Sequence, residues 1–459
     1  MKTLNKGFDE YIKKFDNLVQ KYIPPKKDWT PPDVAVYGQK DLYRIPLKEA
    51  KDLQFKAIKY QFKNQFENNK MYHGFCKELN KSPSDIKKYD DLEKIPLVPG
   101  EFYKDYPTGR DFALWLANIF TGEIPQIKIS GKNPSFDDVI NSFNSTGLAV
   151  AYSSGTSGRH TFIPRDGRTF NISEYAIAKL AITMAYPSWH HNSYGYLLMP
   201  NPFKTNVYAG KVCTIYFDVI KNVTSAIDRE INTDLIKMSM VGGSGLKAKM
   251  IKSTLARMNK KIINNIIKWL EKNDKEKNRI VFAGAPFFLY AVTNKLKEQG
   301  RTFDFSDRST ILTGGGWKIH EARRMPVDDF RKQMKEVLGI KPEHCLDGYG
   351  MVEGNGWMIH CPEGHYLHIP NSYFHPLVLD DEFKPVGYGE YGRFAFLDAS
   401  TSSYPGFIIS GDRVRMLEHC PVCDRPGPVL EPEITRASGK EMRGCAEELR
   451  RMISADMGD

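Results

Sequence analysis

The stretch AYSSGTSGRHTFIPRD, Ala151 to Asp166, decides the fold class of this chain. An apolar, strand-like entry runs into the loop SSGTSG, Ser153–Gly158, whose residues are small or lack a side chain. Such residues let the backbone approach a phosphate closely, and their hydroxyl and amide groups donate hydrogen bonds to its oxygens. The loop does not end in the Gly-Lys-Ser/Thr of the Walker pattern. Taken alone, a Ser/Gly/Thr run also fits a flexible linker, so the surrounding segments must decide.

Short apolar runs alternate with helical runs from about Leu148 onward. The run RIVFAGAP ends in Gly284-Ala285-Pro286, and the run STILTGGG precedes another helical segment. Strand, glycine turn and helix in this order predict an α/β sheet whose ligands bind at the strand ends. After Gly354 the pattern changes to short alternating strands, which predicts a small β subdomain.

The order of these patterns predicts three parts of the chain. Residues 1–130 form a mainly helical N-terminal preface, in which Leu92–Pro107 has a loop-like, proline-bounded pattern. Residues 131–433 form the large α/β domain, and the β subdomain occupies 355–433 within it. Residues 434–459 form a short C-terminal tail.

Composition and charge narrow the classes of function. The 459 residues are 41% hydrophobic and 12% aromatic, which predicts a sizeable buried core rather than disorder. No apolar run is long enough for a transmembrane helix or a signal peptide, so we expect a cytoplasmic protein. The net charge of +10 is spread along the chain and favours phosphate-bearing ligands, while no nucleic-acid-binding motif is present. The lysine-rich segment Lys247–Arg279 is interpreted as an amphipathic helix packed on the core, with membrane or partner contact as the alternative.

Three further motifs follow the phosphate loop in order. They are TGGGWK at Thr313–Lys318, DGYGMVE at Asp347–Glu353 and SGD at Ser410–Asp412. Together the motifs resemble the ordered signatures of the adenylate-forming superfamily, which holds acyl-CoA synthetases and luciferase-like ligases. The resemblance covers some two-thirds of the chain. Within the superfamily, GGGWK and SYPGFIISGD resemble the acyl-protein synthetases of bacterial fatty-acid reductase complexes, and phenylacetate-CoA ligases are the next most similar branch.

The resemblance implies a fold and a role for each motif. We expect an α/β fold, with a large adenylate-forming N-terminal domain, a small β subdomain and a much reduced C-terminal lobe. Glu353 would bind Mg²⁺ and Asp412 would accept hydrogen bonds from the ribose, the alternatives being a surface carboxylate and a turn former. The phosphates of ATP would be held by Ser153, Ser154, Gly155, Thr156, Ser157 and Gly158. The adenine would be flanked by Gly314, Gly315, Gly316, Tyr349 and Gly350.

One catalytic part of the family pattern is missing from this sequence. Most relatives supply a late lysine from a mobile C-terminal domain, whereas only a short segment follows the expected hinge at Ile434–Lys440. Lys318 and Lys440 are the candidates to replace this lysine, and a basic surface residue is the alternative for each. The Pro-Lys pair usual after the phosphate loop is also absent, and whether Arg159 supplies its charge is left open.

The pair Cys420-Pro421-Val422-Cys423 has the two-residue spacing of a zinc knuckle. Because two cysteines cannot hold zinc alone, we assign Cys361 and His368 as the other ligands, with His365 as a substitute for either. Some phenylacetate-ligase relatives carry a structural zinc with similar spacing. Buried free cysteines are the alternative.

Cys445 lies close to the C-terminus, where the acyl-protein synthetases carry the acyl group on a cysteine. Arg443 and a helix beginning near Ala446 would both lower the pKa of its thiol. The alternative is an unreactive cysteine at a helix end. The remaining cysteines are interpreted as core residues: Cys76, Cys213 and Cys345. Two candidates for the acid pocket are weaker: the histidines His190 and His191, which also fit a surface loop, and Gly284–Pro286.

These inferences combine into one expected function. The chain activates a carboxylic acid, expected to be a fatty acid, with ATP and Mg²⁺ and transfers the acyl group to a thiol. The catalytic residues are Glu353, Cys445 and Lys318, and the acceptor feeds an acyl reductase. An acyl- or aryl-CoA ligase that uses coenzyme A is the first alternative, and a non-catalytic nucleotide-binding scaffold subunit is the second.

Overall fold

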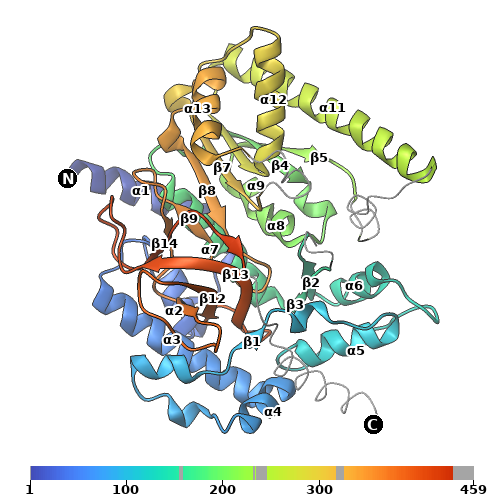
Figure 1. Cartoon of the computed structure of the whole chain (residues 1–459), viewed down its shortest axis with the longest axis vertical. Coiled ribbons are helices and arrows are strands. Elements are labelled where there is room, and N and C mark those ends of the chain that lie inside the picture. Colours follow the sequence, from blue (N-terminus) through green and yellow to red (C-terminus); the bar gives the residue numbers. More distant parts are fainter. Residues whose placement is uncertain (1, 155–158, 231–232, 234–245, 317–324, 438–459) are drawn as a thin grey trace.

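The computed structural model describes residues 2–154, 159–230, 233, 246–316 and 325–437. Its centre is one large mixed sheet in the order β11-β12-β13-β14-β10-β9-β8-β7-β6-β4-β5, with β1 and β15 both paired to β13 (Figure 1). A separate two-stranded hairpin is formed by β2 and β3. The mixed α/β fold expected from the sequence is confirmed.

One half of the sheet is parallel. Its strands are β4 (Tyr194–Pro200), β5 (Asn222–Ile227), β6 (Ile280–Gly284), β7 (Ser309–Gly314) and β8 (Cys345–Tyr349). Strands such as β6 are continuous apolar runs because helices cover both faces of a parallel sheet. The carboxyl ends of β7 and β8 therefore bring the glycine turn and the DGYGMVE motif to one edge of the sheet.

The other half of the sheet is antiparallel. It contains β9 (Met358–His360), β10 (Leu367–His368), β11 (Phe374–Leu379), β12 (Tyr391–Asp398), β13 (Phe407–Leu417) and β14 (Val429–Leu430). Two short strands, β1 (Val98–Pro99) and β15 (Thr435–Arg436), flank β13. The strands predicted after Gly354 are thus present. They continue the main sheet through the β8–β9 pair instead of forming a sheet of their own.

Three helices cover one face of the parallel half (Figure 1). They are α11 (Leu246–Lys275), α12 (Pro286–Glu298) and α13 (Val327–Leu338). Ile266 of α11 and Leu289 of α12 are fully buried in one cluster with Phe282 of β6. This packing is what the spacing of isoleucines along α11 predicts. Among the described residues, no helix is both long and apolar enough to cross a membrane.

The remaining helices pack mainly around the other face and the antiparallel half. They are α1 (Lys2–Leu18), α2 (Pro31–Tyr37), α3 (Leu47–Asn68), α4 (Lys70–Glu78), α5 (Arg110–Ile119), α6 (Phe136–Asn144), α7 (Gly167–Met184), α8 (Tyr208–Lys211) and α9 (Tyr216–Val219). Short 3₁₀ helices connect these elements: η1 (Gln20–Tyr22), η2 (Lys26–Asp28), η3 (Pro83–Asp85), η4 (Tyr89–Lys94), η5 (Phe102–Lys104), η6 (Pro202–Lys204), η7 (Val212–Ile215), η8 (Ser306–Arg308) and η10 (Pro342–His344).

The first 130 residues share a core with the rest of the chain. Phe62 of α3 packs edge-on against Phe407 of β13, and both belong to one large apolar cluster. Buried glutamines of α3 donate to backbone carbonyls far along the chain: Gln54 to Phe374 at 2.7 Å and Gln61 to Thr401 at 2.8 Å. The predicted helical preface therefore packs as part of the main body, and its boundary at residue 130 stays a prediction.

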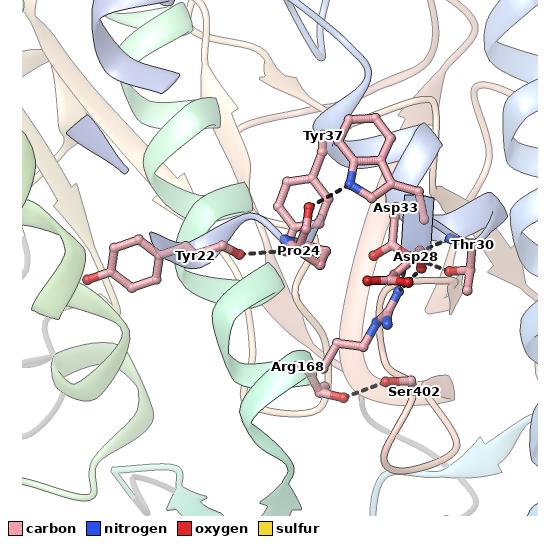
Figure 2. Close-up of polar contacts among 10 residues, drawn as sticks. Tyr22, Pro24, Asp28, Thr30, Asp33, Tyr37, Arg168 and Ser402 are labelled. Carbon is pink, nitrogen blue, oxygen red and sulfur yellow. Dashed lines mark hydrogen bonds and ion pairs between the residues drawn. The ribbon is translucent and has the colours of Figure 1, made fainter. Parts of the chain in front are cut away.

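Helix α2 is tied to α7 by charge and by capping (Figure 2). Asp33 accepts hydrogen bonds from the backbone N–H and hydroxyl of Thr30, which caps the helix. The same carboxylate pairs with Arg168, which also donates to the Asp28 carbonyl at 3.2 Å. Trp29 donates its indole N–H to the Pro24 carbonyl at 2.9 Å. This contact set fixes the N-terminal helices on the helix that follows the phosphate-loop hairpin.

Candidate functional site

The two ends of the phosphate loop are fastened to each other. β2 (Ala149–Tyr152) and β3 (Phe162–Arg165) pair in antiparallel fashion, so the residues that enter and leave the loop lie side by side. Ser153 donates its N–H to the Thr161 carbonyl at 3.0 Å, and the Ser153 Oγ accepts from the Thr161 N–H at 2.9 Å. Ser153 and Ser154 are half-buried. The other four predicted loop residues lie outside the described residues: Gly155, Thr156, Ser157 and Gly158.

Glu353 lies in the turn that follows β8 and is only 9% exposed. Burial raises the pKa of its carboxyl group, and the charge of Lys104 and a hydrogen bond from the Thr161 side chain partly oppose that rise. The charge of Asp412 raises the pKa further. Because Thr161 contacts both Ser153 and Glu353, the carboxyl group lies beside the exit of the phosphate loop. A divalent cation bound there would bring the pKa back down and restore the carboxylate.

The turn that carries Glu353 is held by buried polar groups from other elements. Asn355 donates its backbone N–H to Asp398 Oδ2 at 2.6 Å and its side-chain amide to Ser400 Oγ at 3.1 Å. The Asn355 Oδ1 accepts from the Tyr208 hydroxyl at 3.0 Å. All four residues are fully or almost fully buried, so these bonds are protected from competing water. Glu353 is therefore positioned by β12 and α8 as well as by its own strand.

Arg165 is a second support for this turn, and the sequence motifs did not reveal it. Its side chain is completely buried and donates to the carbonyl of Val352, the residue before Glu353, and to the Tyr404 hydroxyl. The guanidinium also lies 4.4 Å from the centre of the Tyr208 ring. A buried cation held by tyrosine rings and a carbonyl fixes the backbone beside Glu353. The only sequence signal was its place seven residues after the phosphate loop, at the end of the next apolar segment.

The segment before residue 107 also reaches the site, and sequence reasoning assigned it only a loop. β1 inserts beside β13, and Gly100 donates its N–H to the Ile409 carbonyl at 2.8 Å. This places Lys104 close enough for its charge to act on Glu353. Arg159 forms a 3.4 Å ion pair with Asp105 and remains 67% exposed. The guanidinium of Arg159, whose role in replacing the missing lysine charge was left open, is thus paired with an acid outside the loop.

Tyr349 and Asp412 meet across the strand ends. The Tyr349 hydroxyl donates to Asp412 Oδ2 at 2.7 Å, and Arg436 pairs with the other carboxylate oxygen, Oδ1, at 2.7 Å. Burial is the main cause that raises the pKa of Tyr349, and the negative charge of Asp412 adds to it. The structure therefore brings the predicted adenine and ribose residues together, and it adds Arg436 from β15 to them.

The glycine turn after β7 has the backbone that its sequence suggests. Gly315 and Gly316 have φ angles of 77° and 63°, a region that glycine adopts without steric cost. Gly314 pairs with Gly348 of β8, one residue before Tyr349, and Gly350 follows that tyrosine. The turn is thus adjacent to the Tyr349–Asp412 pair. Lys318 lies outside the described residues.

The four predicted zinc ligands form one group. The ligand atoms of Cys361, His368, Cys420 and Cys423 all lie within 4.8 Å of one another. Cys361 Sγ and Cys420 Sγ are 4.0 Å apart, and Cys423 Sγ is 3.3 Å from His368 Nε2. Zn–S bonds of about 2.3 Å in a tetrahedron place two sulfurs roughly 3.8 Å apart, so the spacing fits that ion. His365, the substitute ligand, lies outside the group. Burial lowers the pKa of its imidazole to about 4, so the ring is neutral near neutral pH.

The weaker candidates for the acid pocket have other environments. His191 stacks on Tyr11 and its Nε2 lies 3.1 Å from the Tyr11 carbonyl, so it joins α1 to the core, while His190 is exposed. Pro286, at the predicted pocket wall, lines a cavity of about 30 Å³, which is room for a water molecule. Other residues lining that cavity include Thr313, Phe330, Arg331 and Asp347.

Three of the remaining cysteines are buried in the core, as the sequence predicted. Burial raises the pKa of the Cys76, Cys213 and Cys345 thiols to about 12. Such thiols are almost entirely protonated near neutral pH and are poor nucleophiles. Cys445 and Lys440 lie outside the described residues.

Comparisons with known proteins identify the family of this chain. Residues 218–454, just over half of the chain, match the family described as "Acyl-protein synthetase, LuxE". This chain belongs to the LuxE family. Two curated proteins of similar length, each named long-chain-fatty-acid–luciferin-component ligase, resemble the chain along most of its sequence. The Vibrio harveyi protein is 25% identical over 89% of this chain and 90% of its own, and the Aliivibrio fischeri protein is 24% identical over 90% and 92%.

The LuxE-family chain also has the fold of proteins whose structures have been solved. An open conformation of 2-hydroxyisobutyryl-CoA ligase with 2-HIB-AMP and CoA superposes with a TM-score of 0.55 at 15% identity, covering 86% of this chain and 76% of that one. Its thioesterification state gives 0.57 at 16% identity, covering 90% and 72%. At this identity the likeness concerns the fold, which confirms the adenylate-forming architecture.

Family membership confirms the expected class of activity. The LuxE-family chain is an AMP-forming acid–thiol ligase, which activates a carboxylic acid with ATP and passes the acyl group to a thiol. The roles of individual residues at the site stay predictions.

Proposed function

We propose that this LuxE-family chain activates a long-chain fatty acid at the edge formed by Ser153, Glu353 and Asp412 and transfers the acyl group to its own Cys445. The convergence of these three residues carries the proposal. Thr161 contacts both Ser153 and Glu353, and Asp412 is near enough for its charge to act on Glu353. Segments more than 250 residues apart along the chain therefore meet where a nucleotide would bind.

In this proposal each group acts on a different part of ATP. The residues Ser153–Gly158 hold the β- and γ-phosphates, and Asp412, oriented by Tyr349, accepts hydrogen bonds from the ribose hydroxyls. Glu353 is the ligand for Mg²⁺, which supplies charge neutralisation at the phosphates when bound. Burial favours this assignment because a buried carboxyl group with a raised pKa gains most from a neighbouring cation.

The reaction proceeds in two displacements. A carboxylate oxygen of the acid attacks the α-phosphorus, the bond to the bridging oxygen breaks, and pyrophosphate leaves with that electron pair. A thiolate sulfur then attacks the acyl carbon, the bond to the AMP oxygen breaks, and a thioester remains. The first step needs positioning and charge neutralisation more than acid–base help, since the attacking group is already an anion.

The proposed acceptor is Cys445. The environments of the other six cysteines make them unsuited to carry the acyl group, which supports this choice. Three are buried, with the pKa raised to about 12, and three belong to the Cys/His group. Cys445 has Arg443 beside it, which favours the thiolate. An acyl reductase is the partner that would take the acyl group from this thioester. We place the protein in the cytoplasm, where ATP is available and thiols stay reduced.

We also propose a structural zinc ion bound by Cys361, His368, Cys420 and Cys423. Three thiols and one imidazole at these distances make a complete tetrahedral set without a free position. Such a site holds the β9–β10 segment to the loop before β14 and takes no part in the chemistry.

Coenzyme A as the acceptor is the second candidate function. It is favoured by the fold shared with 2-hydroxyisobutyryl-CoA ligase, whose structures contain CoA. In that case the thioester would be released as free acyl-CoA and Cys445 would have no role.

Labelling of the protein distinguishes the two candidates. With ATP, Mg²⁺ and a radioactive fatty acid, we expect a protein-bound label that hydroxylamine releases. Cys445→Ser should abolish the label and leave ATP–pyrophosphate exchange intact, because the adenylating residues lie elsewhere. Cys213→Ser, at a buried thiol, is the matched control and should still be labelled. Label that survives Cys445→Ser, or acyl-CoA formed equally by wild type and variant, would refute the Cys445 route.

A further inference from the structure

The outward face of α11 carries five exposed basic residues, here called the basic stripe: Arg257, Lys261, Lys268, Lys272 and Lys275. Their spacing of four, seven, four and three residues keeps all of them on one face of a helix. The opposite face holds Ile262, Ile266 and Leu270, which are buried in the core. At about 1.5 Å per residue the basic stripe is about 27 Å long, and it lies at the rim of the molecule (Figure 1).

The acids of α11 leave the basic stripe uncompensated. Residues 246–270 contain no aspartate or glutamate. The two acids further along the helix are paired with other cations, Glu271 with Arg301 at 2.6 Å and Asp274 with Arg308 at 3.4 Å. Within the part of the chain that the structure describes, none of the five cations forms an ion pair. The basic stripe therefore gathers on one face as many charges as half of the chain's net charge of +10.

Helix α13, which covers the same face of the sheet, has a different kind of exposed face. Its exposed charged positions carry both signs: Asp328, Asp329, Lys332, Lys335 and Glu336. Neighbouring charges of opposite sign cancel, whereas a row of one sign creates a potential that reaches about 8 Å into solvent at physiological salt. The basic stripe is thus suited to attract a surface that bears many negative charges.

The shape and chemistry of the basic stripe favour a flat anionic surface. Four of its five residues are lysines, whose flexible stems end in point charges that need no fixed geometry. Because the row follows one straight helix, a flat surface contacts all five cations at once. Asn264 and Asn265, beside the stripe, are polar, whereas protein interfaces concentrate aromatic residues at their centres.

We propose that the basic stripe docks the protein on a membrane with anionic lipid headgroups, from which the protein takes its long-chain acid. A long hydrocarbon chain partitions into a bilayer, so the acid is concentrated there. Only this uptake rests on the proposed function. The contact is peripheral, since no described helix is long and apolar enough to cross a membrane. Each cation at such a surface raises the affinity by about fivefold, which gives reversible and salt-sensitive binding.

Sedimentation of the full chain with lipid vesicles tests the docking. The wild type should bind vesicles of phosphatidylcholine mixed with phosphatidylglycerol and should bind pure phosphatidylcholine vesicles far more weakly. It should be released at about 1 M NaCl, where charges are screened within about 3 Å. The triple variant Lys261→Glu, Lys268→Glu and Lys272→Glu should bind the anionic vesicles about 100-fold more weakly or worse.

A second triple variant is the matched control: Lys13→Glu, Lys48→Glu and Lys384→Glu. These lysines are exposed on other parts of the chain, and their reversal lowers the net charge by the same six units, from +10 to +4. The control should bind anionic vesicles within about threefold of wild type, because charges far from the contact are screened.

The uptake of the acid is measured separately by ATP–pyrophosphate exchange. With an acid dispersed in solution, the variant of the basic stripe should react at the wild-type rate, since the stripe is not part of the nucleotide edge. With a long-chain acid supplied in anionic vesicles, its KM for the acid should rise by about tenfold or more while kcat stays unchanged. An unchanged KM would overturn the uptake.

The remaining outcomes separate the docking from its alternatives. Equal losses in the two triple variants would reduce the effect to net charge and overturn the docking, as would wild-type binding by the stripe variant or no preference for anionic vesicles. Binding of polyaspartate through the basic stripe without binding to vesicles would indicate an acidic protein instead. If the glutamate variant does not fold, glutamines at the same three positions carry the comparison. A wild type that docks but shows no exchange with any acid refutes the proposed function and the uptake, while the docking stands.

Discussion

The Cys/His group (Cys361, His368, Cys420 and Cys423) and the proposed nucleotide edge (Ser153, Glu353 and Asp412) include neighbouring parts of the chain. They differ in whether the protein alone supplies all the groups that the site needs. The group has four ligand atoms within 4.8 Å of one another, all supplied by the protein. At the nucleotide edge, Glu353 is buried with a raised pKa, and Asp412 is shared between Tyr349 and Arg436. In our proposal the edge gains its charge balance from ATP and Mg²⁺, whereas the group binds only an ion.

The difference has a chemical origin. Thiolates and imidazole form short, strong bonds to zinc and saturate a tetrahedron, which suits an ion that stays in place. Carboxylates bind Mg²⁺ loosely and leave positions for water and phosphate, which suits a ligand that is consumed at every turnover. We therefore expect changes in the group to act on stability and changes at the edge to act on the reaction.

The largest expected effect is on the Cys/His group. Replacing Cys420 and Cys423 together by serine should abolish the proposed zinc binding and lower the free energy of unfolding by about 3 kcal/mol or more, since metal binding and folding are coupled at such sites. Metal content by atomic emission and the melting temperature measure the two effects.

Cys213→Ser is the control for this double variant, because Cys213 is buried but distant from the group. It should keep the metal. A double variant that retains about one zinc per chain would show that these cysteines are not ligands. The expectation that changes in the Cys/His group act on stability through the metal would then be wrong.

Glu353→Gln should produce the next largest effect, on the reaction alone. Loss of the Mg²⁺ ligand should lower the rate of ATP–pyrophosphate exchange by about tenfold or more. Glu343→Gln, at an exposed carboxylate, should leave the rate unchanged. A wild-type exchange rate in Glu353→Gln would exclude the magnesium role.

The stability of Glu353→Gln sharpens the same comparison. Because burial raises the pKa of this carboxyl group in the folded chain, its ionisation costs stability as the pH rises above the pKa of the unfolded chain. Below that pH both states are protonated and the cost is absent. Glutamine removes the cost, so the melting temperature at neutral pH should not fall. A large fall would mean that Glu353 serves the fold rather than the reaction.

Tyr349→Phe should have the smallest of these effects. The variant loses the 2.7 Å hydrogen bond that orients Asp412, while Arg436 still holds the other carboxylate oxygen. We expect KM for ATP to rise by about three- to tenfold with kcat nearly unchanged. A change of this size corresponds to the net free energy that one such hydrogen bond usually contributes. Tyr391→Phe removes an exposed hydroxyl bonded to Glu431 and is the control. An unchanged KM in Tyr349→Phe would separate the tyrosine from nucleotide binding.

Local patterns were sufficient to predict much of the fold, and they indicated the candidate residues of the site. Alternating apolar runs predicted the strands after Gly354, and isoleucines at helical spacing predicted the buried face of α11. The spacing of Cys420 and Cys423 indicated a metal site, and the structure places Cys361 and His368 beside them. In each case the signal was carried by residues that are close together in the sequence.

Contacts between distant segments were the part that local patterns could not predict. The insertion of β1 beside β13 brings Lys104 to Glu353, although the sequence there indicated only a loop with prolines. The burial of Arg165 beside Val352 had no signature either, because an arginine after a strand is most often exposed.

The sequence by itself determined the class of this protein, because the phosphate loop and the motifs at Asp347–Glu353 and Ser410–Asp412 follow one another in the order that the adenylate-forming superfamily shows. Only the tertiary structure decided which other side chains join them. It brought Arg436 to Asp412 and placed Trp357 against Gly348 and Gly350 at the end of β8. Such contacts depend on how strands pair and helices pack over long separations in the chain, and no short stretch of residues specifies that arrangement.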